Sequence, residues 1–211
     1  WIKVGMVLKN TSSKLFLSWV KFSSQSSVFD WNDIDDLYIK WDNFNENDNL
    51  TICSLIYWCK ECNKIEFNKI NEKTVQKYIH YSFNNITDYD IANVLYNLYK
   101  ESFTCVNIKN SIWYEFNNHR WEQIDSGSSL RIKISKELFE IYKKYLNKTI
   151  YRLEENSDEK KEFLNKFSKL SKILKTANDK NNIMKEAKEL YYDKEFFNKL
   201  DSNPYLLGCA N

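Results

Sequence analysis

The chain has 211 residues, 43% hydrophobic and 16% aromatic, a composition that argues against a disordered protein and leaves room for one large or two small domains. Three glycines and one proline are too few for an all-β or loop-rich fold, so we expect helices to dominate. The formal net charge is only +2, and no apolar run approaches the roughly 18 residues of a membrane span. Because the chain begins at Trp1 without a secretory signal, we expect a piece of a longer protein.

The first 62 residues predict four amphipathic helices separated by polar turns. Gly5 would let a neighbouring element approach the first helix closely. Asp30 can cap the third helix and Thr51 the fourth. In chain order, the predicted apolar stripes are Trp1, Val4 and Leu8; Leu15, Phe16, Trp19, Val20 and Phe22; Ile34, Leu37, Tyr38 and Trp41; and Ile52, Leu55, Cys59 and Cys62.

Two patterns in this region are candidates for metal binding. The cluster Asp33, Asp35 and Asp36 could bind a cation, but acidic residues in the first turn of a helix are favoured by its dipole, so we expect a solvated cluster. Cys59 and Cys62 have the spacing of half a zinc site or of a redox pair. A structural zinc site needs four ligands, and the other cysteines and histidines are scattered. We therefore favour reduced thiols buried in a helix interface, and predict no metal or other cofactor.

Residues 63–86 are polar and helical in pattern, with Val75 and Ile79 as expected anchors. Thr87-Asp88 then caps a helix that places Ile91, Val94, Leu95 and Leu98 inside and Asn93, Asn97 and Lys100 outside. The pair Asp88 and Asp90 is similar in spacing to the carboxylates of two-metal enzymes. A cap with a dipole partner is the favoured interpretation, because no third acidic ligand on a strand accompanies the pair.

The centre of the chain predicts a three-stranded antiparallel meander. Residues 104–108 form the first strand, and residues 113–116 and 120–124 form a hairpin around Asn117-Asn118, which tolerates positive φ. Residues 125–128 offer several N-caps for a helix from about Ser129. The predicted fold class is therefore mainly α with a small β-meander, an α+β chain in which a helical bundle precedes a mixed helical and β collar-type domain.

The helix after the hairpin is the one basic stretch of the chain: residues 130–152 contain seven basic and two acidic groups. Its predicted stripe is Leu130, Ile134, Leu138, Ile141 and Tyr145. We expect the cations off that stripe, with two neighbours on the hairpin, to contact phosphates and stack on bases of DNA. These residues are Arg120, Trp121, Arg131, Lys133, Lys136, Lys143 and Lys144. A solvated lysine-rich surface is the alternative.

Two further helices follow. The first begins at residues 156–158 and carries Phe163, Phe167, Leu170 and Leu174 on one stripe. Residues 178–182 are expected to break it, and the last helix carries Ile183, Ala187, Leu190 and Tyr191.

Two resemblances to known families are carried by specific runs of residues. Trp1-Ile-Lys-Val-Gly-Met-Val-Leu-Lys-Asn10, Ile39-Lys-Trp-Asp-Asn-Phe44 and Leu55-Ile-Tyr-Trp-Cys-Lys-Glu-Cys62 resemble the type-2 primase C-terminal domain. Residues 87–211, through Ile91-Ala92, the Trp113 and Trp121 hairpin and the closing run from Leu200 to Asn211, resemble the accessory domain before the superfamily 3 helicase of poxvirus-type and giant-virus helicase-primases. The implied domains are 1–64, a 65–86 helical connector, and 87–211.

The resemblance implies a non-catalytic linker and collar of a viral DNA-replication primase-helicase. With only Gly5, Gly127 and Gly208, the chain cannot contain a phosphate-binding loop, so ATP and magnesium are expected in flanking domains. The implied partners are single-stranded or forked DNA, other replication proteins and copies of the protein in a hexameric ring, with no membrane. Five cysteines without a disulfide framework suit a reducing intracellular compartment, and the resemblance implies the host cytoplasm. A protein-docking module without DNA contact and a zinc-stabilised enzyme are the alternatives.

Overall fold

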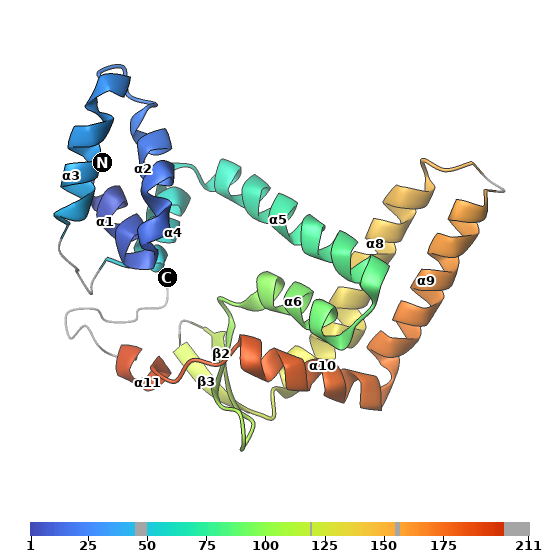
Figure 1. Cartoon of the computed structure of the whole chain (residues 1–211). Coiled ribbons are helices and arrows are strands. Elements are labelled where there is room, and N and C mark those ends of the chain that lie inside the picture. Colours follow the sequence, from blue (N-terminus) through green and yellow to red (C-terminus); the bar gives the residue numbers. More distant parts are fainter. Residues whose placement is uncertain (45–49, 119, 155–156, 201–211) are drawn as a thin grey trace. The chain divides into compact units, whose positions relative to one another are not determined.

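The computed structural model describes residues 1–44, 50–118, 120–154 and 157–200, and this part of the chain is mainly helical with one three-stranded antiparallel sheet (Figure 1). The predicted fold class is confirmed. The chain divides into two compact units, Trp1–Asn71 and Glu72–Asn211. Within the described ranges, no helix combines the length and apolar character needed to cross a membrane.

The first unit contains α1 (Ile2–Thr11), α2 (Phe16–Ser23), α3 (Ile34–Asp42) and α4 (Ile52–Cys62) around a small aromatic core. Its buried members are Trp19, Val20, Leu37 and Trp41. A Cβ atom at Gly5 would lie 2.7 Å from Trp19 Cε2, so the predicted close approach is confirmed. The buried residues of α1 are Gly5 and Val7, whereas Trp1 of the predicted stripe is exposed.

The prediction for the cysteines of α4 is wrong. Cys53, Cys59 and Cys62 are all exposed, and none of the residues of α4 is buried. The helix packs against α1, but Leu55 is the one residue of its predicted stripe that is even half-buried. When a helix has two partly apolar faces, the periodicity of its sequence does not decide which face packs against the rest of the protein. The only buried cysteine in the described residues is Cys105, in the second unit.

The second unit is built from the C-terminal part of α5 (Lys64–Asn85) and all later elements. Val75 and Ile79 of α5 are buried as predicted. α6 (Asp88–Tyr99) packs along α10 (Ala177–Leu190), and α8 (Phe139–Ile150) packs along α9 (Asp158–Lys175), as Figure 1 shows. A short helix, α11 (Phe196–Lys199), follows. The core includes Ile91, Leu95, Trp113, Leu130, Tyr142, Leu170, Leu174 and Ile183.

The sheet has the predicted order β1 (Phe103–Asn107), β2 (Ile112–Asn117), β3 (Arg120–Asp125). Asn117 pairs with Arg120, so the reversal lies one residue later than predicted, and Asn118 takes the positive φ of 47°. Position 119 lies outside the described residues. The edge of β1 is covered by the segment after α10, because Cys105 N–H donates to Tyr191 O and Asp193 N–H donates to Cys105 O.

A long helix after the sheet is interrupted by a π-helical turn. α7 (Ser128–Lys133) begins after its N-cap residue, Gly127, which has a positive φ of +68°. Among the described residues, no side-chain hydrogen bond caps this helix, so the predicted side-chain N-cap is not found. The π-helical segment Ile134–Leu138 then leads into α8. Leu130, Ile134 and Leu138 are buried as predicted, but the stripe continues at Tyr142 and Leu146. The extra residue of a π turn shifts the phase, which leaves Ile141 and Tyr145 only half-buried.

The boundaries of α9 and α10 differ in how closely they follow the sequence prediction. Ser157 Oγ accepts from Lys160 N–H and begins α9, while Asn156 and the closing run 201–211 lie outside the described residues. A break between two helices is present, but its expected position at residues 178–182 is wrong, because α9 ends at Lys175 and α10 starts at Ala177. Asp179 sits in the first turn of α10, where a carboxylate favours helix rather than ending it.

Candidate functional site

The seven predicted DNA-contact residues are distributed over β3 and the three consecutive segments of the long helix that follows it. Arg120 and Trp121 are on β3, and Arg131 and Lys133 are on α7. Lys136 is in the π-helical segment, and Lys143 and Lys144 are on α8. The contacts of each residue therefore decide whether it is available to a ligand.

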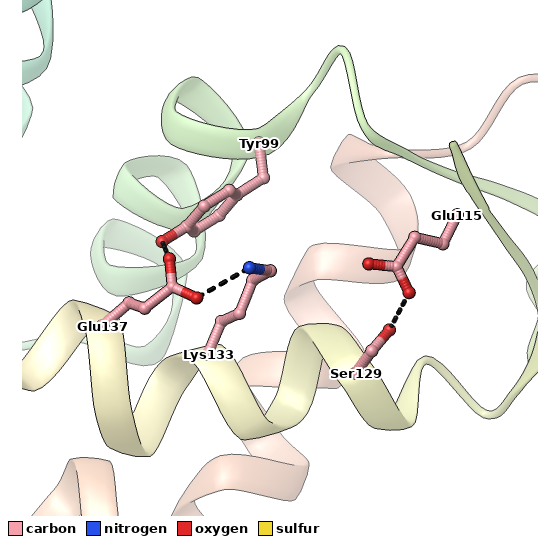
Figure 2. A network of polar contacts seen from close by, with 5 residues as sticks. All are labelled: Tyr99, Glu115, Ser129, Lys133 and Glu137. Atoms are coloured by element: carbon pink, nitrogen blue, oxygen red, sulfur yellow. Dashed lines mark hydrogen bonds and ion pairs between the residues drawn. The ribbon is translucent and has the colours of Figure 1, made fainter. Parts of the chain in front are cut away.

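Lys133 is committed to contacts within the protein. Its Nζ donates to Glu137 Oε1 at 2.7 Å and lies 5.0 Å from the centre of the Tyr99 ring. The Tyr99 hydroxyl donates to the other Glu137 oxygen at 2.7 Å, so one carboxylate joins α6 to the long helix (Figure 2). The hydrogen bonds from Lys133 and Tyr99 hold the pKa of Glu137 below its usual range, and burial raises the pKa of Tyr99. Lys133 is thus a structural cation.

A second contact in Figure 2 fixes the start of the same helix against the sheet. Ser129 Oγ donates to Glu115 Oε2 of β2 at 2.6 Å. Together with the Tyr99–Glu137 bond, it holds the long helix at two places along its first turns.

Trp121 and Arg120 also have partners. The Trp121 ring packs against Phe116 at 5.3 Å and against Phe196 of α11 at 5.1 Å between ring centres. Arg120 Nε donates to Glu122 Oε1 at 2.7 Å on the exposed surface of β3. The Trp121 ring therefore already has two aromatic neighbours within the protein.

The remaining three lysines face solvent. Lys136, Lys143 and Lys144 are exposed, and they form no ion pair with a carboxylate in the described ranges of the chain. These cations fit either the predicted contact surface or the solvated alternative.

Arg131 is held by the last long helix, which the sequence did not connect with it. Its guanidinium donates to Asn181 Oδ1 at 3.1 Å and to Ala177 O at 3.2 Å, both on α10. This contact places Arg131 beside Lys185 and Lys188, which line the same pocket between α7, α10 and the sheet. Sequence reasoning missed both lysines. Their i, i+3 spacing off the apolar stripe of α10 indicates a basic face of that helix, but nothing in the spacing identifies α7 as the neighbour.

The acidic candidates for metal binding behave as helix starts. Asp33, Asp35 and Asp36 are exposed around the first turn of α3, as expected for a solvated cluster. Asp90 N–H donates to Thr87 Oγ1 at 3.1 Å, which confirms the cap before α6. Burial, and then the nearby Asp179, raise the pKa of Asp88. The described residues contain no group of three histidine, cysteine or acidic side chains that could hold a metal ion.

Comparison with known proteins gives two matches in consecutive parts of the chain. Residues 1–59 match the family model described as Primase C terminal 2, and residues 92–211 match the model described as D5 N terminal like. Both resemblances found in the sequence are confirmed by these matches.

Relatives align with the whole of this chain. A protein of Acanthamoeba polyphaga mimivirus that bears the name of a helicase is 32% identical over 220 residues. A Frog virus 3 protein also named as a helicase is 25% identical over 250 residues, and an African swine fever virus protein named as a primase is 25% identical over 239 residues. The chain spans 22%, 25% and 24% of the length of these three relatives, respectively.

Proposed function

The D5 N terminal like model matches more than half of this chain, so the chain belongs to that family, and from that premise we propose a non-catalytic linking and DNA-guiding region of a viral replication primase-helicase. The observation that best supports this proposal is the order of the two family matches along the chain. A primase C-terminal module at residues 1–59 precedes the helicase-associated module at residues 92–211. A region in that position joins the activity before it to the motor after it.

The proposed division of labour follows from the chemistry of the side chains. Primer synthesis and ATP hydrolysis need clustered carboxylates, bound magnesium and a phosphate-binding loop. The acidic pairs of this chain instead cap or begin helices. We therefore assign ATP and magnesium to flanking domains of a longer protein, and assign to this region the assembly of subunits into a hexameric ring and the guidance of single-stranded or forked DNA.

The test uses the purified chain. Fluorescence anisotropy with a labelled oligo(dT) measures DNA affinity at low and high salt, and a phosphate-release assay measures ATP hydrolysis with and without DNA. We expect salt-dependent binding without hydrolysis. Hydrolysis or primer synthesis by this chain would overturn the non-catalytic role. Absence of binding even at low salt would overturn DNA guidance and favour the docking-module alternative.

Self-association is tested separately by native mass spectrometry of the same chain. Oligomers that form over a concentration series would support the contribution to ring assembly. A chain that stays monomeric at every concentration would restrict the role of this region to linkage and DNA guidance.

A further inference from the structure

The pocket between α7, α10 and the sheet gathers three basic side chains from two helices of the second unit. Arg131 comes from α7, and Lys185 and Lys188 come from α10. One carboxylate, that of Asp125 at the end of β3, also lines it. The pocket lining therefore has an excess of two positive charges. This equals the formal net charge of the whole chain, so positive charge is concentrated at the pocket.

These cations are bonded to neutral oxygens rather than to carboxylates. Arg131 donates to an amide and a backbone carbonyl, Lys188 donates to Ser111 Oγ, and Lys185 donates to Asn182 Oδ1 at 3.4 Å. These bonds orient the side chains without neutralising their charges, so the pocket keeps its excess of two positive charges over Asp125. They also leave three of the five Arg131 N–H donors and two on each lysine available to a ligand. An anion with several acceptor oxygens satisfies such a site best.

The shape and the remaining lining define the ligand further. The pocket has a volume of about 620 Å³, enough for a nucleotide unit of a polymer. Ser126 and Ser128 add hydroxyl donors, and the exposed Ile132 and buried Met184 add apolar wall. None of the lining residues, all within the described ranges, is aromatic, so the pocket has no platform on which a base could stack. It is therefore suited to a backbone phosphate and the adjoining sugar, independently of sequence.

We propose that this pocket binds a phosphodiester group of single-stranded DNA, held by Arg131, Lys185 and Lys188. The assignment rests on the proposed DNA-guiding function and moves its main contact from the exposed lysines of α8 to the junction of α7 and α10. Lys185 is the best single probe, because it is exposed and its one side-chain bond among the described residues is to Asn182, one turn earlier on α10.

The experiment compares matched variants of the whole chain by anisotropy with labelled oligo(dT) over a range of salt concentrations. Lys185→Gln with Lys188→Gln is the pocket variant, and Lys185→Gln alone repeats the test without disturbing the Lys188–Ser111 bond. Lys169→Gln with Lys172→Gln, on exposed positions of α9, is the control that removes the same charge elsewhere. Circular dichroism confirms folding of each variant.

We expect the double pocket variant to bind at least about tenfold more weakly, because it loses two charge-assisted contacts. The slope of log affinity against log salt should become shallower by about 0.7, because the pocket neutralises one phosphate and each phosphate neutralised on a single strand contributes about 0.7. The α9 control should match the unsubstituted chain. Asp125→Asn should bind more tightly, an increase that general loss of structure would not produce.

Three results would overturn the assignment. Pocket variants that bind DNA with unchanged affinity and slope would place the phosphate contact elsewhere and leave the proposed function standing. Displacement of oligo(dT) by inorganic phosphate at an equal concentration of phosphate groups would assign the pocket to a free ion. An unsubstituted chain that does not bind oligo(dT) at all would overturn DNA guidance and the pocket assignment together.

Discussion

Ser82 Oγ and the Tyr142 hydroxyl lie 2.6 Å apart in the core of the second unit, and both side chains are fully buried. This bond joins α5 to α8. Since the Ser82 hydroxyl donates to Ile79 O at 3.1 Å, Tyr142 is the donor to Ser82. Burial raises the pKa of Tyr142, so the phenol stays protonated and can serve as that donor at neutral pH.

This direction of the hydrogen bond predicts that removing Ser82 Oγ and removing the Tyr142 hydroxyl lower the free energy of unfolding by different amounts. Ser82→Ala leaves the Tyr142 hydroxyl buried without its acceptor and should lower the free energy of unfolding by about 1–3 kcal/mol. Tyr142→Phe leaves Ser82 bonded to Ile79 O and should cost about 1 kcal/mol. The double variant should be more stable than Ser82→Ala alone. Urea denaturation followed by circular dichroism measures all three, and a loss for Tyr142→Phe as large as that for Ser82→Ala would contradict the assigned donor.

Glu137 should make stability depend on pH. Its pKa is lowered in the fold, first by the hydrogen bond from Lys133 and then by the one from Tyr99. The carboxylate therefore stabilises the folded state at pH values above the ordinary glutamate pKa of 4.5, and this contribution is lost as the pH falls through the lower pKa of the folded protein. Glu137→Gln should be less stable than the unsubstituted chain at neutral pH, with a gap that closes in acid. Thermal melts across that range check it, with Glu140→Gln on α8 as the control; a gap that stays constant with pH would contradict the linkage.

Gly127 should not tolerate a side chain. Its φ is +68°, and an added Cβ would lie 2.8 Å from Met184 Cε and 3.2 Å from Trp113 Cε2. Gly127→Ala should lower the free energy of unfolding by about 1–3 kcal/mol through backbone strain and crowding. The preceding Ser126 already has a positive φ of 50°, so Ser126→Gly should not destabilise the fold. Chemical denaturation compares the two, and a Gly127→Ala variant of unchanged stability would refute the prediction.

Trp121 should matter for folding more than for DNA. Trp121→Ala removes its ring contacts with Phe116 and Phe196 and should cost about 2 kcal/mol of stability. Phe197→Ala on α11, where the side chain is exposed, is the comparison and should cost less. At a temperature where Trp121→Ala remains folded, its affinity for oligo(dT) should match that of the unsubstituted chain. A selective loss of DNA affinity would restore the base-stacking role predicted from the sequence.

Local patterns in the sequence were sufficient for most of the fold. Alternation around Asn118, the Thr87 cap and the apolar residues of α6 are signals within a few residues, and the structure confirms the elements they predict. Cys59 and Cys62 show the limit of periodicity. It shows that two side chains share a helix face, but whether that face is covered depends on the packing of α4 against the rest of its unit.

The candidate site depended on long-range packing and could not be predicted in the same way. Arg131 was identified from the charge of its own helix, but its bonds to α10 join residues 46 and 50 positions apart. Lys185 and Lys188 become part of the site only through that contact. Lys133 looked equally available in the sequence, and the structure shows it bonded to Glu137.

The π-helical segment Ile134–Leu138 makes this stretch unusually tolerant of a change in length. In an unbroken α-helix, Leu130 and Leu146 would point roughly 160° apart, because each residue advances by about 100°. One inserted residue, accommodated as a π turn, reduces that divergence to roughly 60°, and both leucines are buried. Deleting the exposed Lys136 would remove the insertion and leave both flanks in phase, whereas deleting a residue within α8 would turn everything after it away from α9.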